Sequence, residues 1–64
     1  MTTELNIDAS TVIATGTYDV NGVLVVWYKF ETLEALEANF IANMAHWEAI
    51  SRKTKIIGKK ILIF

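Results

Sequence analysis

The chain has 64 residues, of which 53% are hydrophobic and 20% charged, with a formal net charge of −1 and neither cysteine nor proline. This length allows one small domain, residues 1–64, and the lack of cysteine excludes disulfides. A low charge without proline disfavours disorder. A chain this short buries only about 60% of its surface on folding, so we expect self-association to add the missing stability.

The compartment is predicted from what the chain lacks. The longest apolar run, Val23 to Tyr28, is far shorter than the roughly 20 residues of a membrane span. The first residues lack the basic start and apolar core of a signal peptide. We therefore expect a cytoplasmic, intracellular protein that does not enter a membrane.

A β-hairpin is predicted over residues 11–30, after a lead-in at residues 1–10 that could extend the first strand. Asn21 and Gly22 both tolerate the positive φ of a type I′ turn, and β-rich runs flank them. Such a turn pairs Val20 with Val23 and Gly16 with Trp27. Both faces of this hairpin carry apolar side chains, so we expect both to be covered.

One long helix is predicted over residues 32–53. Thr32 is a suitable N-cap, and Arg52 and Lys53 fall in the last turn, where cations are favoured. At 100° per residue, six large apolar side chains share one stripe, which we expect to lie on the sheet. They are Leu33, Leu36, Phe40, Met44, Trp47 and Ile50.

The opposite helix face is rich in alanine, with Ala38, Ala42, Ala45 and Ala49 at spacings of four, three and four. Alanine is the best helix former, which alone would explain the pattern. Small side chains also let two helices approach closely, and on this basis we expect a homodimer or higher oligomer assembled through this face.

Residues 54–64 read as a third strand, with Gly58 at a bulge or bend. The predicted fold is therefore α+β in the order β-β-α-β. It has a three-stranded, mostly antiparallel sheet with one long helix packed across one face.

No catalytic motif is present. The single histidine, His46, lies mid-helix near Asn39 and Asn43, where a hydrogen-bonding role is expected rather than catalysis. Gly58-Lys59-Lys60 lacks the other residues of a phosphate-binding loop. With one histidine and no thiolate, the composition also disfavours a structural zinc site. We expect a protein that is not an enzyme and that uses neither a metal nor a cofactor.

Charge is distributed unevenly along the chain. Residues 1–50 carry seven acids and one base, whereas residues 51–64 carry five bases and no acid. The acidic helix edge of Glu34, Glu37 and Glu48 suits a basic groove on another protein. The favoured hypothesis is a small interaction module that self-associates and binds a macromolecular target. Its size suits an inhibitor or accessory factor of viral or mobile-element origin.

Two alternatives stay open. The first is a nucleic-acid-binding regulatory protein, in which Trp27, Tyr28 and Trp47 would stack on bases. Its phosphate contacts would come from the basic segment, namely Arg52, Lys53, Lys55, Lys59 and Lys60. The second is a small-ligand sponge with pockets between subunits.

Overall fold

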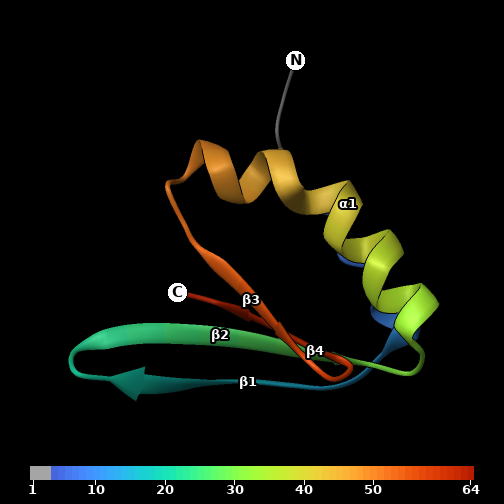
Figure 1. The fold of residues 1–64 in the computed structure, drawn as a ribbon, viewed down its shortest axis with the longest axis horizontal. Coiled ribbons are helices and arrows are strands. Elements are labelled where there is room, and N and C mark those ends of the chain that lie inside the picture. The colour runs from blue at the N-terminus through green and yellow to red at the C-terminus, as the bar shows by residue number, and fades with distance from the viewer. Residues whose placement is uncertain (1–3) are drawn as a thin grey trace.

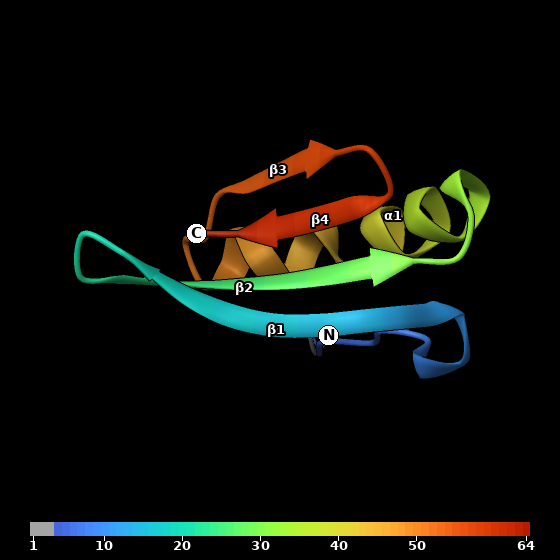
Figure 2. The ribbon, with the colours of Figure 1, turned by 90° about the horizontal axis from the view of Figure 1, so that it is seen from below.

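The computed structural model describes residues 4–64, which form one α-helix and a four-stranded antiparallel sheet (Figures 1 and 2). The strands are β1 (Val12–Val20), β2 (Val23–Phe30), β3 (Thr54–Ile57) and β4 (Lys60–Ile63), in the sheet order β1-β2-β4-β3. Helix α1 (Leu33–Ala49) packs on one face of the sheet, and a short 3₁₀ helix, η1 (Ala9–Thr11), leads into β1. The predicted α+β class is confirmed.

The β1–β2 hairpin has the predicted turn and register. Asn21 and Gly22 have φ values of 52° and 84°, and Val20 pairs with Val23. The backbone N–H of Gly22 donates to the Asp19 carboxylate at 2.7 Å, which closes the turn. One irregularity, between residues 12 and 14, shifts the register at the start of β1.

The prediction of a single C-terminal strand is wrong, because residues 54–64 form two strands rather than one. Gly58 has a φ of +62° and lies in the tight turn that joins β3 to β4. The chain therefore reverses, and Thr54 pairs with Ile63. Strand β4 lies between β2 and β3, so the element order is β-β-α-β-β, with four strands in place of the predicted three.

Helix α1 begins as predicted and ends earlier. The Thr32 hydroxyl accepts a hydrogen bond from the backbone N–H of Ala35 at 3.1 Å, as an N-cap does. At the other end Ser51 adopts a φ of 58°, and the N–H of Arg52 donates to the Trp47 carbonyl at 2.8 Å. This Schellman-type ending stops the helix at Ala49, before the predicted end at residue 53.

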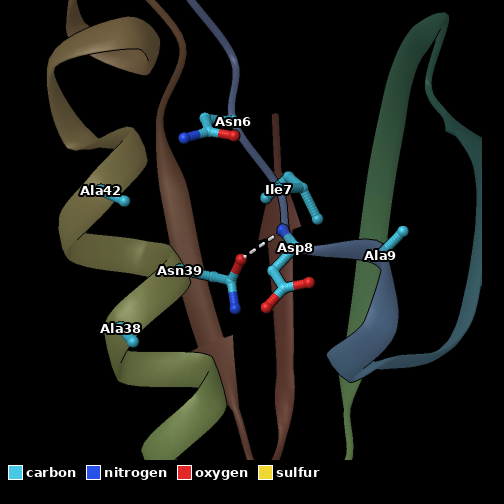
Figure 3. A pocket seen from close by; sticks show the side chains of 7 residues that line it. All are labelled: Asn6, Ile7, Asp8, Ala9, Ala38, Asn39 and Ala42. Atoms are coloured by element: carbon cyan, nitrogen blue, oxygen red, sulfur yellow. Dashed lines mark hydrogen bonds between the residues drawn. The ribbon is translucent and has the colours of Figure 1, made fainter.

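The buried face of α1 is rotated from the predicted stripe. Leu33, Met44 and Ile50 are 55%, 43% and 50% exposed, whereas Asn39 and Asn43 are buried. The cause is the lead-in, whose described part, residues 4–8, runs along α1 and hydrogen-bonds to both asparagines. Figure 3 shows the bond between Asp8 and Asn39. Backbone groups of this segment need polar partners, and the two asparagine amides supply them.

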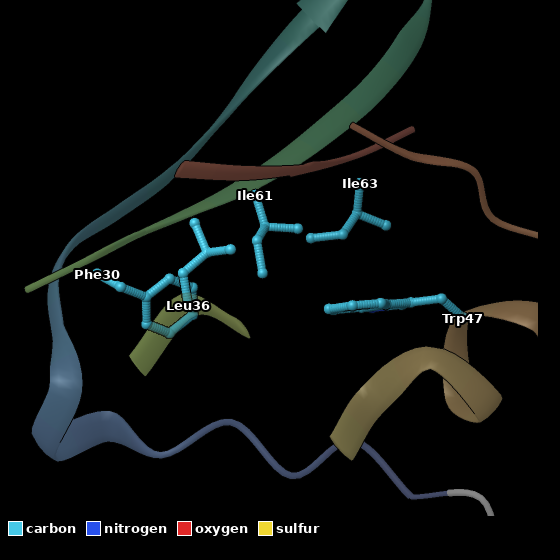
Figure 4. Close-up of a cluster of buried hydrophobic side chains, with 5 residues drawn as sticks. All are labelled: Phe30, Leu36, Trp47, Ile61 and Ile63. Carbon is cyan, nitrogen blue, oxygen red and sulfur yellow. The ribbon is translucent and has the colours of Figure 1, made fainter. Parts of the chain in front are cut away.

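The core lies between α1 and the helix-facing side of the sheet (Figure 4). Phe30, Leu36 and Ile61 are almost completely buried there, with Trp47 and Ile63 beside them. Phe40 packs against this cluster, and its ring centroid lies 5.9 Å from that of Trp47. The predicted stripe is therefore correct for Leu36, Phe40 and Trp47.

Candidate functional site

The sheet face opposite α1 is left open by the described chain, and Figure 2 looks onto it with α1 behind the sheet. Strand alternation and the observed register place Gly16, Tyr18 and Trp27 on this open face. Val25 and Leu62 share it and are nevertheless buried, at 0% and 5% exposure. The open face therefore has a small apolar centre of its own.

Trp27 is held tightly on the open face. Its indole lies directly over Gly16, where an added Cβ would come within 3.0 Å of the indole Cζ2. The Lys60 ammonium lies over the same ring, 4.7 Å from its centroid, a cation–π distance. Only glycine at residue 16 leaves room for this arrangement. Trp27 and Lys60 thus form one preorganised aromatic and cationic pair.

Two further lysines flank this pair. The β2–β4 register places Lys29 opposite Lys60, and the β3–β4 register places Lys55 opposite Leu62. Within residues 4–64 none of these three lysines has a carboxylate partner. Like charges at facing positions destabilise a sheet, so an anion bound on this face would relieve a repulsion already present.

Four of the acidic side chains lie on the helix side of the molecule. Glu34, Glu37 and Glu48 are exposed on α1, and Asp19 belongs to the helix-facing pleat of β1. The uneven charge along the sequence therefore corresponds to a difference in charge between the two sides of the sheet. The open face is basic and aromatic, and the helix layer is acidic.

The predicted basic segment does not form a single surface. Lys55 and Lys60 reach the open face, Lys59 lies in the turn between β3 and β4, and Lys53 joins α1 to β3. Arg52 lines hollows on the helix side. Of this segment, only Lys55 and Lys60 are placed with the open-face aromatics.

The predicted stacking aromatics are also divided. Trp27 is on the open face, Tyr28 packs against the core, and Trp47 belongs to the core. The sequence interpretation missed Tyr18, which is 42% exposed on the open face, and Lys29. The hairpin register could have found both, because it already placed them in one row with Gly16 and Trp27.

The alanine face of α1 is exposed to solvent along its length. Ala38 and Ala42 line a shallow hollow of about 500 Å³ beside the N-terminal segment (Figure 3). The remaining lining residues are Asn6, Ile7, Asp8, Ala9 and Asn39. The Asn39 carboxamide oxygen already accepts the N–H of Asp8 at 2.8 Å, so this polar group serves the fold.

A smaller hollow of about 160 Å³ lies between the end of α1 and the sheet. Leu5, Val26, Ile50 and Ile63 form much of its wall. Tyr28, His46, Trp47 and Arg52 complete it. Among the described residues that line it, none is a serine, a threonine or a carboxylate.

Comparison of the chain with protein-family models, with curated proteins and with solved structures found no match in any of the three. Residues 4–64 hold no group of three or more histidine, cysteine, aspartate or glutamate side chains suited to a metal ion. No helix in the described part of the chain is long and apolar enough to cross a membrane.

Proposed function

We propose that the protein is a small, non-enzymatic binding module whose open sheet face binds single-stranded nucleic acid. The observation that supports this most directly is the placement of Tyr18 and Trp27 among Lys29, Lys55 and Lys60 on one face. Glu34, Glu37 and Glu48 lie on the other side of the fold. A sheet that presents aromatics among cations suits a chain of stacked bases and phosphates.

Each part of the face has a separate role in this proposal. The three lysines contact phosphates, and Tyr18, which is 42% exposed, offers a ring for base stacking. Stacking contributes about 1–3 kcal/mol per base and accepts any base, so we expect little sequence preference. Trp27 carries Lys60 above its ring and positions that ammonium for a phosphate.

A protein target is the second candidate, and the exposed surface of α1 favours it. Ile41 and Met44 are 70% and 43% exposed and lie among Glu34, Glu37 and Glu48. Such a surface fits an apolar groove with a basic rim on another protein, as an inhibitor would need. The sequence placed this candidate first, and the paired aromatics and lysines of the open face are our reason for reversing that order.

The test is fluorescence anisotropy of a labelled single-stranded oligonucleotide, titrated with protein at several salt concentrations. Neutralising about three phosphates predicts a logarithmic salt slope near −2, which is about a fourfold loss of affinity for each doubling of salt. Lys29→Glu with Lys55→Glu should abolish binding, and Tyr18→Ala should weaken it roughly tenfold.

Arg52→Glu is the matched control, because it makes the same kind of charge change on the helix side. It should reduce affinity far less than the same change at Lys55. Equal losses from Arg52→Glu and Lys55→Glu would show that binding follows net charge and not the open face. Absence of binding at low salt would contradict nucleic-acid binding and favour a protein target.

A further inference from the structure

Strand β1 lies at one edge of the sheet, and among residues 4–64 it pairs only with β2 (Figure 2). It has nine residues, against four in β3 at the opposite edge. An edge strand presents a row of unpaired backbone N–H and C=O groups, which makes it a template for another strand. β1 is therefore the longer of the two free edges.

The hairpin geometry identifies the backbone groups that face outward. In a two-residue hairpin the pair that closes the turn, here Val20 and Val23, is hydrogen-bonded, and bonded pairs alternate along the strands. Gly16 and Tyr18 consequently bond to β2. The N–H and C=O groups of Thr15 and Thr17 point away from the sheet.

β1 lacks three of the residue types that normally keep an edge strand from pairing, since it contains no lysine, no arginine and no proline. Its one register irregularity lies at the start of the strand, between residues 12 and 14. Its single charge, Asp19, accepts the N–H of Gly22 at 2.7 Å and is therefore tied to the hairpin turn. The opposite edge, β3, is short and carries Lys55. A short length and a lysine therefore protect the β3 edge, and β1 has neither.

We propose that β1 pairs with β1 of a second copy of this chain, antiparallel, about a two-fold axis at Gly16. This register places Thr15 opposite Thr17 of the second copy, so the outward backbone groups meet as a hydrogen-bonded pair. It places Asp19 opposite Ile13, so no like charges face each other. The strand is thus complementary to itself in backbone bonding and in charge.

Side chains also gain partners in this arrangement. Tyr18 faces Ala14 of the second copy on the open side, and Ile13, which is 58% exposed, faces Asp19. Gly16 faces Gly16 of the second copy at a non-hydrogen-bonded pair, where two antiparallel strands approach most closely and glycine leaves the most space. The product is one continuous eight-stranded sheet whose two open faces lie on the same side.

Two measurements test this proposal on the whole chain. Light scattering should give twice the chain mass at high concentration. Under the same conditions, the amide protons of Thr15 and Thr17 should exchange with solvent roughly tenfold or more slowly than in dilute protein, as measured by NMR. The amides of Gly16 and Tyr18 bond to β2 in either state and serve as internal references.

A matched pair of variants at one residue isolates the edge. Thr17→Pro removes an outward N–H and should give a folded protein with the mass of one chain, since an edge strand tolerates proline there. Thr17→Val keeps the N–H and should remain a dimer. Circular dichroism checks that both are folded.

Three outcomes would overturn the proposal. The first is a single-chain mass for the wild type at every concentration. The second is a dimer in which the amides of Thr15 and Thr17 still exchange rapidly. The third is a dimer lost in Ala42→Glu with Ala45→Glu and kept in Thr17→Pro, which would place the interface on the alanine face of α1.

Discussion

The carboxamide of Asn43 forms two hydrogen bonds to the backbone of Asn6. Its Oδ1 accepts the N–H of Asn6 at 2.6 Å, and its Nδ2 donates to the carbonyl of Asn6 at 3.2 Å. One helical turn earlier, Asn39 accepts the N–H of Asp8 at 2.8 Å. The two asparagines, spaced by four on α1, thus match alternate residues of an extended segment and fix it beside the helix.

We expect Asn43→Ala to lower the free energy of unfolding by about 2 kcal/mol. The change leaves the N–H and C=O of Asn6 without their partners, although alanine is the better helix former. Chemical denaturation measures the loss. Glu37→Ala, at an exposed position of the same helix, is the control and should change stability by less than about 0.5 kcal/mol. Equal effects would mean that the N-terminal segment is not held by Asn43.

The orientation of α1 is tested by one substitution at two leucines. Leu36 is 1% exposed and Leu33 is 55% exposed. Leu36→Ala should cost about 2–5 kcal/mol, which is enough to unfold much of a small domain, because it removes core contacts and leaves a cavity. Leu33→Ala should cost less than about 1 kcal/mol. Comparable losses in thermal melts would instead favour the stripe predicted from the sequence, which contains both leucines.

Ser51 occupies the left-handed conformation that ends α1, with a φ of 58°. A residue with a Cβ pays a steric penalty there that glycine does not. We expect Ser51→Gly to raise the unfolding free energy by about 0.5–1 kcal/mol. The contrasting change Ala45→Gly, inside the helix at an exposed position, should lower it by about 1 kcal/mol. Destabilisation by both would contradict the Schellman-type ending.

Gly16→Val should disturb the open face without touching a lysine. The new side chain would overlap the indole of Trp27, whose Cζ2 already lies 3.0 Å from the position of a Cβ. We expect a loss of about 1–3 kcal/mol, together with a shift of tryptophan fluorescence as Trp27 moves off Gly16. Thr17→Val, on the same strand and the opposite pleat, should leave the fluorescence unchanged. Identical spectra for both variants would argue against this packing.

Local signals made much of the fold predictable. Asn21-Gly22 set the hairpin and its register, and Thr32 marked the first turn of the helix, because these features depend on residues close in sequence. The turn at Gly58 was read as a bend within one strand. Four-residue strands leave too short an alternation to separate the two interpretations.

The buried face of α1 and the open-face site depend on contacts distant in sequence. Asn39 and Asn43 looked like surface residues because their partners lie 31 and 37 positions away. The lysines on the open face come from three strands. Lys29 and Lys60 are far apart in the sequence, and they are neighbours only because β4 pairs with β2. The distribution of charge along the chain identified the basic segment. The sheet order was needed to show that Lys55 and Lys60 are the part of it that lies on the same face as the aromatics.

The position of β4 between β2 and β3 sets an order on the folding process. The β1–β2 hairpin, the β3–β4 hairpin and α1 each form from neighbouring residues and can begin early. Joining Val26 to Ile63 closes a loop that contains the entire helix, which makes β2–β4 the costliest of the three strand pairings in conformational entropy. We therefore expect the docking of β4 on β2 to be the step that converts two hairpins and a helix into one cooperative unit.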